Sequence, residues 1–365
     1  MVIDGASWDG AGGDGARFRS DLQSALDEHL AEMGDRLALL GPDVTRLLDQ
    51  ADVSTRGGKR LRASFCWWGH HAVAGALPAD AERHLLRASA SLELLHASAL
   101  VHDDLMDASD TRRGHPAAHK VFEAQHRSDG WRGGPEPYGA AAAILLGDLL
   151  LSWSDELLRR SGFALERVGA ALDVLDRCRS EVIAGQYLDV SVQARGHADV
   201  DAAMTVLRYK SAKYSVERPL QVGAALGGAD RAALDALTAY GVPLGEAFQL
   251  RDDLLGVFGD PDATGKPAGD DLVEGKRTVL VALALDGADP AGARLLDSSL
   301  GRPLAPAEVD RLRDVIDGSG ARQQVEDVIA SLTTLALEGL DRAEIDPTAG
   351  RALVGLAGLA TQRTV

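Results

Sequence analysis

Apolar residues recur every three or four positions over long stretches of this chain, and polar residues occupy the positions between them. That spacing places the apolar side chains on one face of an α-helix. Segments with this pattern span residues 81–101, 140–158, 166–192, 200–226, 232–257 and 321–343. Stretches rich in glycine and proline, such as residues 130–137, separate the segments, and no run alternates in the manner of a β-strand. The pattern therefore predicts an all-α protein built from long helices.

Length and composition refine this prediction. The chain has 365 residues, of which 45% are hydrophobic and only 4% aromatic, and large helical domains with one core reach this size. Residues 1–17 are rich in Gly and Asp and are expected to be disordered, whereas residues 18–365 are expected to form a single domain. The sequence shows neither a signal-peptide pattern nor an uncharged apolar run long enough for a transmembrane segment. Cys66 and Cys178 stand alone in apolar surroundings, which predicts buried thiols and favours a cytoplasmic location.

One short segment carries an unusual density of charge at the end of an apolar helix. Asp103, Asp107 and Asp110 follow one another at helical spacing, so their carboxylates share one face. Clustered oxygen ligands without Cys or His favour Mg²⁺ over Zn²⁺. Arg112 and Arg113 follow directly, and guanidinium groups suit bidentate binding of phosphate. The segment therefore indicates a site for Mg²⁺ and a diphosphate.

On its own this segment could equally be a solvated acidic helix end, because charge runs usually lie on the surface. A second apolar stretch, residues 246–260, also contains paired carboxylates, Asp252 and Asp253. Charges inside an apolar stretch are usually paired or bound to a metal. Cations gather in residues 56–62 and in the glycine-rich segment 262–278. The net charge of −17 and the lack of a basic stripe with interleaved aromatics argue against nucleic acid as a partner, and the pattern indicates two small diphosphates instead.

Six short motifs, taken in order, resemble those of the trans-isoprenyl diphosphate synthases (polyprenyl synthetases), and most closely the bacterial geranylgeranyl diphosphate synthases. The motifs contain Gly57-Gly58-Lys59-Arg60-x-Arg62, His96 with Asp103-Asp104-x-x-Asp107 and Arg112-Arg113-Gly114, Gly185-Gln186, Lys210-Ser211, Phe248-Gln249-x-x-Asp252-Asp253, and Gly265-Lys266 with Gly275-Lys276. The second acidic motif departs from the usual Asp-Asp-x-x-Asp of the family, because Gly256 occupies its fifth position. The resemblance implies an all-α isoprenoid synthase bundle with a deep central cavity and both acidic motifs at its rim.

The resemblance also implies roles for individual residues. Metal ligands would be Asp103, Asp104 and Asp107 from one side, and Asp252 with Asp253 or Asp260 from the other. The cations expected to bind the allylic diphosphate are Arg112, Lys210 and Lys266. Isopentenyl diphosphate would be bound by Lys59, Arg62, His96 and Arg113. Supporting polar residues would be Gln186, Asp189 and Gln249. The cofactor expected from these ligands is Mg²⁺, for which Mn²⁺ can substitute.

The implied reaction is condensation of isopentenyl diphosphate with an allylic diphosphate, with release of diphosphate. Ser98 and Ala99 precede Asp103 by five and four positions, where a bulky aromatic residue in the family stops elongation at fifteen carbons. Small side chains there predict a product of twenty carbons, geranylgeranyl diphosphate, or somewhat longer. The family resemblance also predicts a homodimer.

Two other functions remain open from the sequence. A class I terpene cyclase also ionises a metal-bound allylic diphosphate, but it has no use for a second-substrate site made of Lys59, Arg62, His96 and Arg113 together. A regulatory subunit of a two-chain synthase would be expected to lose residues of the first acidic motif, which is intact here. The prenyltransferase is therefore the favoured interpretation.

Overall fold

The structure is a computed structural model that describes residues 15–112, 114–196, 199–259 and 269–362. Its first half contains α1 (Gly15–Leu37), η1 (Ala38–Leu40), α2 (Asp43–Thr55), α3 (Leu61–Ala74), α4 (Ala79–Met106), β1 (Thr111–Arg112), β2 (His115–Pro116), α5 (Ala118–Ser128), α6 (Pro135–Arg159) and α7 (Leu165–Arg195). Its second half contains α8 (Val200–Val206), η2 (Leu207–Glu217), α9 (Arg218–Gly227), α10 (Arg231–Phe258), α12 (Asp270–Glu274), α13 (Val279–Gly287), α14 (Pro290–Ser299), α15 (Pro306–Gly318), α16 (Ala321–Asp341) and α17 (Pro347–Thr361).

The helical prediction is confirmed. In the part of the chain that the structure describes, the only strands are β1 and β2, which have two residues each and form a small antiparallel hairpin. The segment 200–226, which the periodicity predicts as one helix, is instead divided into α8, the π-helical segment η2 and α9, which follow one another without a break. Helix α1 begins at Gly15, three residues inside the segment predicted to be disordered.

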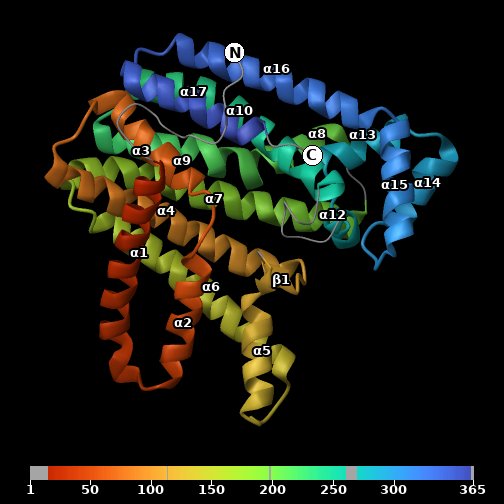
Figure 1. The fold of residues 1–365 in the computed structure, drawn as a ribbon, viewed down its shortest axis with the longest axis horizontal. Helices are drawn as coiled ribbons and strands as arrows, with labels where there is room; N and C mark the ends of the chain where they lie inside the picture. Colours follow the sequence, from red (N-terminus) through yellow and green to blue (C-terminus); the bar gives the residue numbers. More distant parts are fainter. Residues whose placement is uncertain (1–14, 113, 197–198, 260–268, 363–365) are drawn as a thin grey trace.

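Long helices pack side by side and form the body of the molecule, while the α1–α2 hairpin and α5 reach away from it (Figure 1). Helix α4 packs on α6, α3 packs on α9, and α10 lies between η2 and α16. The interface of α4 and α6 buries Leu94, Leu146 and Leu150 completely. Full burial of one leucine side chain stabilises a fold by about 1.5–3 kcal/mol. These apolar layers fix the inner helices that carry the polar residues described below.

Glycines allow the π-helical segment η2 to pack unusually close to its neighbours. A Cβ atom on Gly185 of α7 would overlap the backbone of Lys210 in η2. A Cβ atom on Gly245 of α10 would overlap the backbone of Ala212 in the same segment. Segments of π-helix are rare and often occur at functional sites. The lack of a side chain at these two glycines therefore allows η2 to pack closely against α7 and α10.

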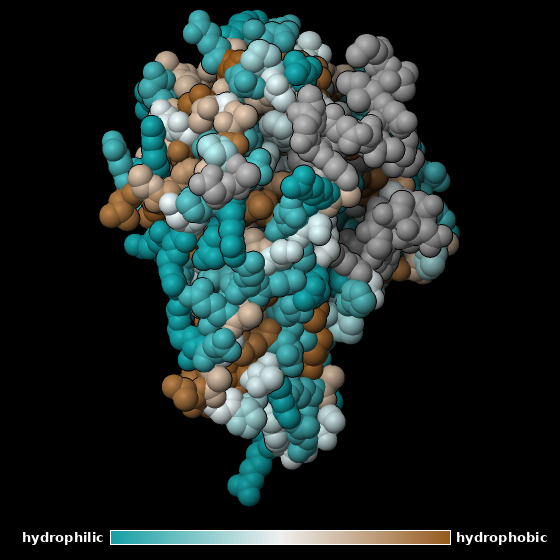
Figure 2. Space-filling view, turned by 60° about the vertical axis from the view of Figure 1, so that its left-hand side comes forward, coloured by the Kyte–Doolittle hydropathy of each residue, from teal (hydrophilic) through white to brown (hydrophobic). Residues whose placement is uncertain are grey.

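The surface is largely polar, in keeping with the strong net negative charge. Figure 2 shows a face covered mainly by hydrophilic side chains, with apolar side chains in separate spots. Among the described residues, no helix combines the length and the apolar composition needed to cross a bilayer. Cys66 and Cys178 are both buried free thiols, as predicted.

Candidate functional site

A cavity of about 810 Å³ lies among the inner helices and receives residues from both acidic segments. The charged and polar residues that line it include Lys59, Arg62, His96, Asp103, Arg112, Gln186, Asp189, Lys210, Gln249, Asp252, Asp253, Asp271 and Lys276. They come from the start of α3, the end of α4, α7, η2, α10, and the segment that contains α12 and leads to α13. The structure thus brings together residues that lie far apart in the sequence.

One face of α4 forms a wall of this cavity. His96, Ala99 and Asp103 line it at intervals of three and four residues, which is the repeat of a single helix face. Ser98 and Asp104 lie one position away from that face, are only 3% exposed, and do not line the cavity. The expectation that Ser98 forms the pocket wall is therefore corrected. Ala99 alone of the two predicted chain-length residues occupies that wall.

The position of Asp104 also differs from the expectation of a metal ligand facing the cavity. Its Oδ1 accepts a hydrogen bond of 2.8 Å from Arg112 Nε, and Arg112 Nη2 donates a second bond to the same oxygen. The β1–β2 hairpin carries Arg112 back over the end of α4, where its guanidinium lies 3.9 Å from an oxygen of Asp103. In this structure Asp104 thus holds Arg112 at the rim of the cavity.

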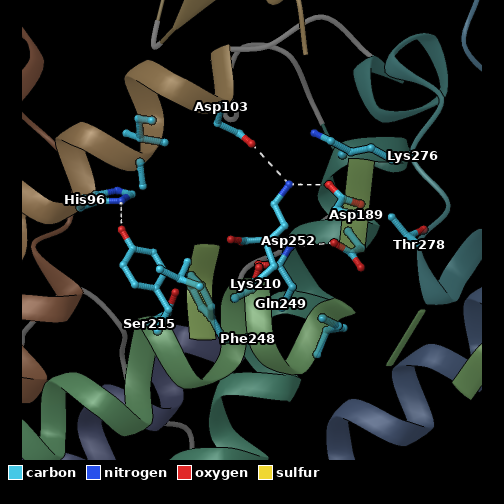
Figure 3. Close-up of a pocket in the computed structure, with 18 of the residues that line it drawn as sticks. His96, Asp103, Asp189, Lys210, Ser215, Phe248, Gln249, Asp252, Lys276 and Thr278 are labelled. Carbon is cyan, nitrogen blue, oxygen red and sulfur yellow. Dashed lines mark hydrogen bonds and ion pairs between the residues drawn. The ribbon is translucent and has the colours of Figure 1, made fainter. Parts of the chain in front are cut away.

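The carboxylate of Asp103 accepts from donors on two other elements, and Figure 3 shows its contact with Lys210 as a dashed line. Its Oδ1 lies 3.3 Å from Lys210 Nζ and accepts a hydrogen bond of 2.9 Å from the amide of Gln186. Lys210 Nζ also donates to Asp189 Oδ2 at 2.6 Å. Burial disfavours the charged form of Asp103, but the ammonium groups of Lys210 and Lys276 outweigh it and lower its pKa. Asp103 is therefore held ionised.

Helix α10 presents the second acidic motif to the same cavity. Asp252, Asp253 and Gln249 all line it, and the Gln249 amide donates to Asp253 Oδ1 at 2.8 Å. Burial, together with repulsion from Asp271, raises the pKa of Asp253 to about 8. Lys276 offsets only part of this effect, so burial dominates at Asp253, whereas at Asp103 the two lysines outweigh burial.

Lys276 bridges the two acidic sides. Its Nζ lies 3.7 Å from Asp107 Oδ2 and 3.4 Å from Asp271 Oδ1, and it forms a closer ion pair with Glu274. Burial disfavours the ammonium, but Asp271 and Glu274 raise its pKa well above the ordinary value, so it is charged. Burial and the charge of Asp103 raise the pKa of Asp107 to about 6. The lysine therefore neutralises carboxylates that would otherwise repel one another.

The donor set suits a hard divalent cation. It consists of carboxylate oxygens from α4, α10 and α12, with no thiol or imidazole among them. Within the described residues, no three His, Cys, Asp or Glu side chains are gathered tightly enough to hold a metal ion by themselves. Mg²⁺ commonly keeps several waters and binds through one or two carboxylates together with substrate phosphates. The residues therefore fit Mg²⁺ bound jointly with a diphosphate.

A separate cationic end of the cavity contains Lys59, Arg62 and His96. Arg62 Nη2 donates to Ser215 Oγ at 2.7 Å, and the guanidinium lies 4.2 Å from the centre of the Tyr214 ring. His96 Nδ1 lies 3.0 Å from the hydroxyl of Tyr214. Arg62 and His96, both predicted to bind a second diphosphate, thus contact the same tyrosine at this end, and the predicted Lys59 lines the cavity as well.

Two predicted site residues, Arg113 and Lys266, lie outside the residues that the structure describes, as does Asp260. The remaining predicted cations all line the cavity. Sequence reasoning missed Lys276 and Tyr214 as members of the site. Lys276 belongs to a Gly-Lys pair that the motif comparison already contained, and Tyr214 stands one helical turn after Lys210.

This constellation of fold and site is that of a prenyltransferase, and the comparisons agree. The chain belongs to the polyprenyl synthetase family, whose sequence profile matches residues 45–317. It is an enzyme of the trans-prenyltransferase class with the all-α isoprenoid synthase fold. The family assignment confirms the resemblance carried by the six motifs.

Individual relatives differ in the product for which they are named. The crystal structure of a geranylgeranyl pyrophosphate synthase from Corynebacterium glutamicum, complexed with isoprenyl diphosphate and magnesium, has a TM-score of 0.91 and 39% identity, covering 95% of this chain and 99% of that one. The (2E,6E)-farnesyl diphosphate synthase of Mycobacterium bovis is 34% identical, covering 80% of this chain and 78% of its own length. The geranylfarnesyl diphosphate synthase of Natronomonas pharaonis is 32% identical, covering 78% of this chain and 80% of its own length. Similarity therefore supports the reaction class and leaves the chain length to be argued from the cavity.

Proposed function

We propose that this enzyme condenses isopentenyl diphosphate with an allylic diphosphate (dimethylallyl, geranyl or farnesyl) and releases diphosphate. The observation that carries the proposal is the division of one cavity into an acidic end with Lys210 and Arg112, and a cationic end with Lys59, Arg62 and His96. A terpene cyclase, which binds one diphosphate, would need only the first of these ends.

The acidic end would hold the allylic substrate. Asp103 of α4, Asp107 directly after this helix, and Asp252 and Asp253 of α10 would bind Mg²⁺, with Mn²⁺ as a possible substitute. Bound there, the metal would supply Lewis-acid stabilisation of the charge that develops on the leaving diphosphate. Lys210 and Arg112 would share that role, with Lys266 as a further expected cation, because fixed positive charges stabilise a leaving anion without reorganisation.

The other substrate would be bound by Lys59, Arg62 and His96 through charge-assisted hydrogen bonds to its diphosphate. This arrangement would place the isopentenyl double bond beside the allylic carbon that loses its diphosphate. The apolar wall at Ala99 and Leu100 would exclude water from the allylic cation, which water would otherwise consume. Each of these residues lines the same cavity.

The proposed product is geranylgeranyl diphosphate. The α4 wall beside Asp103 carries the methyl group of Ala99 and not an aromatic ring, so the growing chain is not stopped at that level. The structural relative from C. glutamicum, whose name refers to the same product, supports this choice.

We also propose that the enzyme works as a homodimer. Helices α6 and α7 contact each other and leave large apolar side chains exposed: Ile144 is 46% exposed, Leu145 61%, Ile183 60% and Tyr187 72%. Apolar side chains gathered on neighbouring helices are typical of an interface between subunits. Light scattering should give twice the chain mass of 38.4 kDa, and a monomeric mass would contradict the proposal.

The assignment of the two ends is tested with Arg62→Ala. The Michaelis constant for isopentenyl diphosphate should rise roughly ten- to hundredfold, because a charge-assisted contact to phosphate is lost, while that for the allylic substrate stays nearly constant. Arg177→Ala is the matched control, since Arg177 is exposed and its side chain bonds only to a backbone oxygen of its own helix among the interactions described. A larger effect on the allylic substrate would mean that the two ends are exchanged.

A further inference from the structure

Tyr214 lies between two of the residues that we assign to the isopentenyl diphosphate site. It is only 6% exposed, yet it lines the cavity. Its hydroxyl is 3.0 Å from Nδ1 of His96, an interaction drawn as a dashed line in Figure 3. The face of its ring lies 4.2 Å from the guanidinium carbon of Arg62. One side chain thus contacts both an imidazole and a guanidinium of the cationic end.

The backbone that carries Tyr214 is firmly held. Tyr214 stands in η2, four residues after Lys210, so both side chains point toward the cavity. The same segment is pressed against α7 at Gly185 and against α10 at Gly245. Ser215, the next residue, accepts a hydrogen bond from Arg62 and is itself buried. The position of Tyr214 is therefore set by packing and does not depend on a bound substrate.

The Tyr214 hydroxyl keeps its proton over the whole working pH range and can therefore donate it. Burial raises its pKa far above the ordinary value, and the nearby Arg62 offsets only part of this effect. A neutral imidazole that accepts a hydrogen bond at Nδ1 carries its own proton on Nε2. In that tautomer Nε2 carries the one N–H of the ring, and this is the hydrogen that His96 can offer to an anion in the cavity.

We propose that Tyr214 is a positioning residue. Its hydroxyl fixes His96 as the Nε2–H tautomer, and its ring packs against the guanidinium of Arg62. Both residues then donate hydrogen bonds to the diphosphate of isopentenyl diphosphate. This inference rests on the proposed function. Tyr214 does not itself touch the diphosphate, but it determines which ring nitrogen of His96 carries the hydrogen that bonds to the diphosphate. The side chains of His96 and Arg62 are then already oriented before the substrate binds, which reduces the conformational entropy lost on binding.

Tyr214→Phe is the first test, because it removes the hydroxyl and keeps the ring under Arg62. The Michaelis constant for isopentenyl diphosphate should rise about three- to tenfold, as expected for one lost hydrogen bond, while that for the allylic substrate stays unchanged. Tyr209→Phe is the matched control, since Tyr209 is 38% exposed on the same segment and does not line the cavity. An unchanged constant in Tyr214→Phe would overturn the proposal.

Two further measurements separate positioning from a general structural effect. Nitrogen-15 NMR of labelled histidine should show His96 as the Nε2–H tautomer in the wild type and as a mixture in Tyr214→Phe. In a His96→Gln background, Tyr214→Phe should lose most of its effect, because an amide has no tautomer to fix; an effect of full size there would overturn the proposal. The proposed function fails independently if the wild type consumes no isopentenyl diphosphate at all.

Discussion

Gly256 takes the fifth position of the second acidic motif, the position of the last aspartate in the Asp-Asp-x-x-Asp form that the first motif has, and the structure gives a reason for the difference. A Cβ atom built on Gly256 would lie 3.0 Å from Asp271 Oδ1 and would overlap Oδ2 of the same carboxylate. The carboxylate of Asp271 thus occupies the space that the missing side chain would need. We therefore predict that Gly256→Ala damages the site even though it adds only a methyl group.

The size of the effect follows from what Asp271 contacts. The obstacle is the end of a side chain, so the backbone of α10 need not move, but the carboxylate must leave its place 3.4 Å from Lys276 Nζ. Interactions of this charged kind are worth about 1.5–3 kcal/mol, so kcat/KM should fall roughly ten- to hundredfold. Replacing glycine by alanine inside a helix contributes up to about 1 kcal/mol of stability, so the melting temperature should not fall with the activity.

The assay combines steady-state kinetics over a range of Mg²⁺ concentrations with thermal unfolding of the same preparations. Gly169→Ala in α7 is the matched control, because Gly169 is exposed and has no atom near its would-be Cβ. That variant should be slightly stabilised and fully active. Gly256→Asp, which restores the usual motif, should be no better than Gly256→Ala. Full activity in Gly256→Ala, or a gain in Gly256→Asp, would refute the reasoning.

Two other predictions concern protons and product length. The raised pKa of Asp253, about 8, lies above that of an unfolded carboxyl, so the metal-free protein should lose stability as the pH rises from about 4 to about 8. Mg²⁺ binds the ionised carboxylate, so its stabilising effect on the melting temperature should be larger at pH 8.5 than at pH 6; equal shifts would contradict this. Ala99→Phe should shorten the product toward fifteen carbons, because a ring would block the cavity wall. Ser98→Phe should instead lower the melting temperature by overpacking a buried position, without changing the product, and chromatography of both variants separates the two outcomes.

Much of the fold could be predicted from the sequence, because amphipathic helices are recognised by apolar residues that recur every three or four positions. The segments that form α4, α7 and α10 have this period, and the two acidic motifs lie at the end of α4 and within α10. The division of residues 200–226 into α8, η2 and α9 could not be predicted. It depends on close contacts with Gly185 and Gly245, which lie on other helices.

The composition of the site was partly predictable for a similar reason. Helical spacing places Asp103 and Asp107 on one face of the helix, but it does not determine which residues beside that face line the cavity. That choice separates Ala99, which lines the cavity, from Ser98, which is buried beside it. The bonds from Arg112 to Asp104 depend on how the β1–β2 hairpin turns back, which local pattern does not specify.

The pairing of Lys276 with the first acidic motif is a contact between distant parts of the chain. Its partner Asp107 lies at the end of α4, whereas Lys276 follows α12. No spacing within either segment could reveal this contact. The folded structure brings their charges within reach of each other, so that they neutralise one another.

The central claim is that one cavity joins isopentenyl diphosphate to an allylic diphosphate with the help of a divalent metal. The most direct test is product analysis of the purified protein with isopentenyl diphosphate and each of dimethylallyl, geranyl and farnesyl diphosphate, with Mg²⁺ and with a chelator. We predict geranylgeranyl diphosphate and free diphosphate from these starters in Mg²⁺, with no turnover in chelator. Undiminished turnover in chelator would contradict the account, as would a cyclic hydrocarbon formed without consumption of isopentenyl diphosphate.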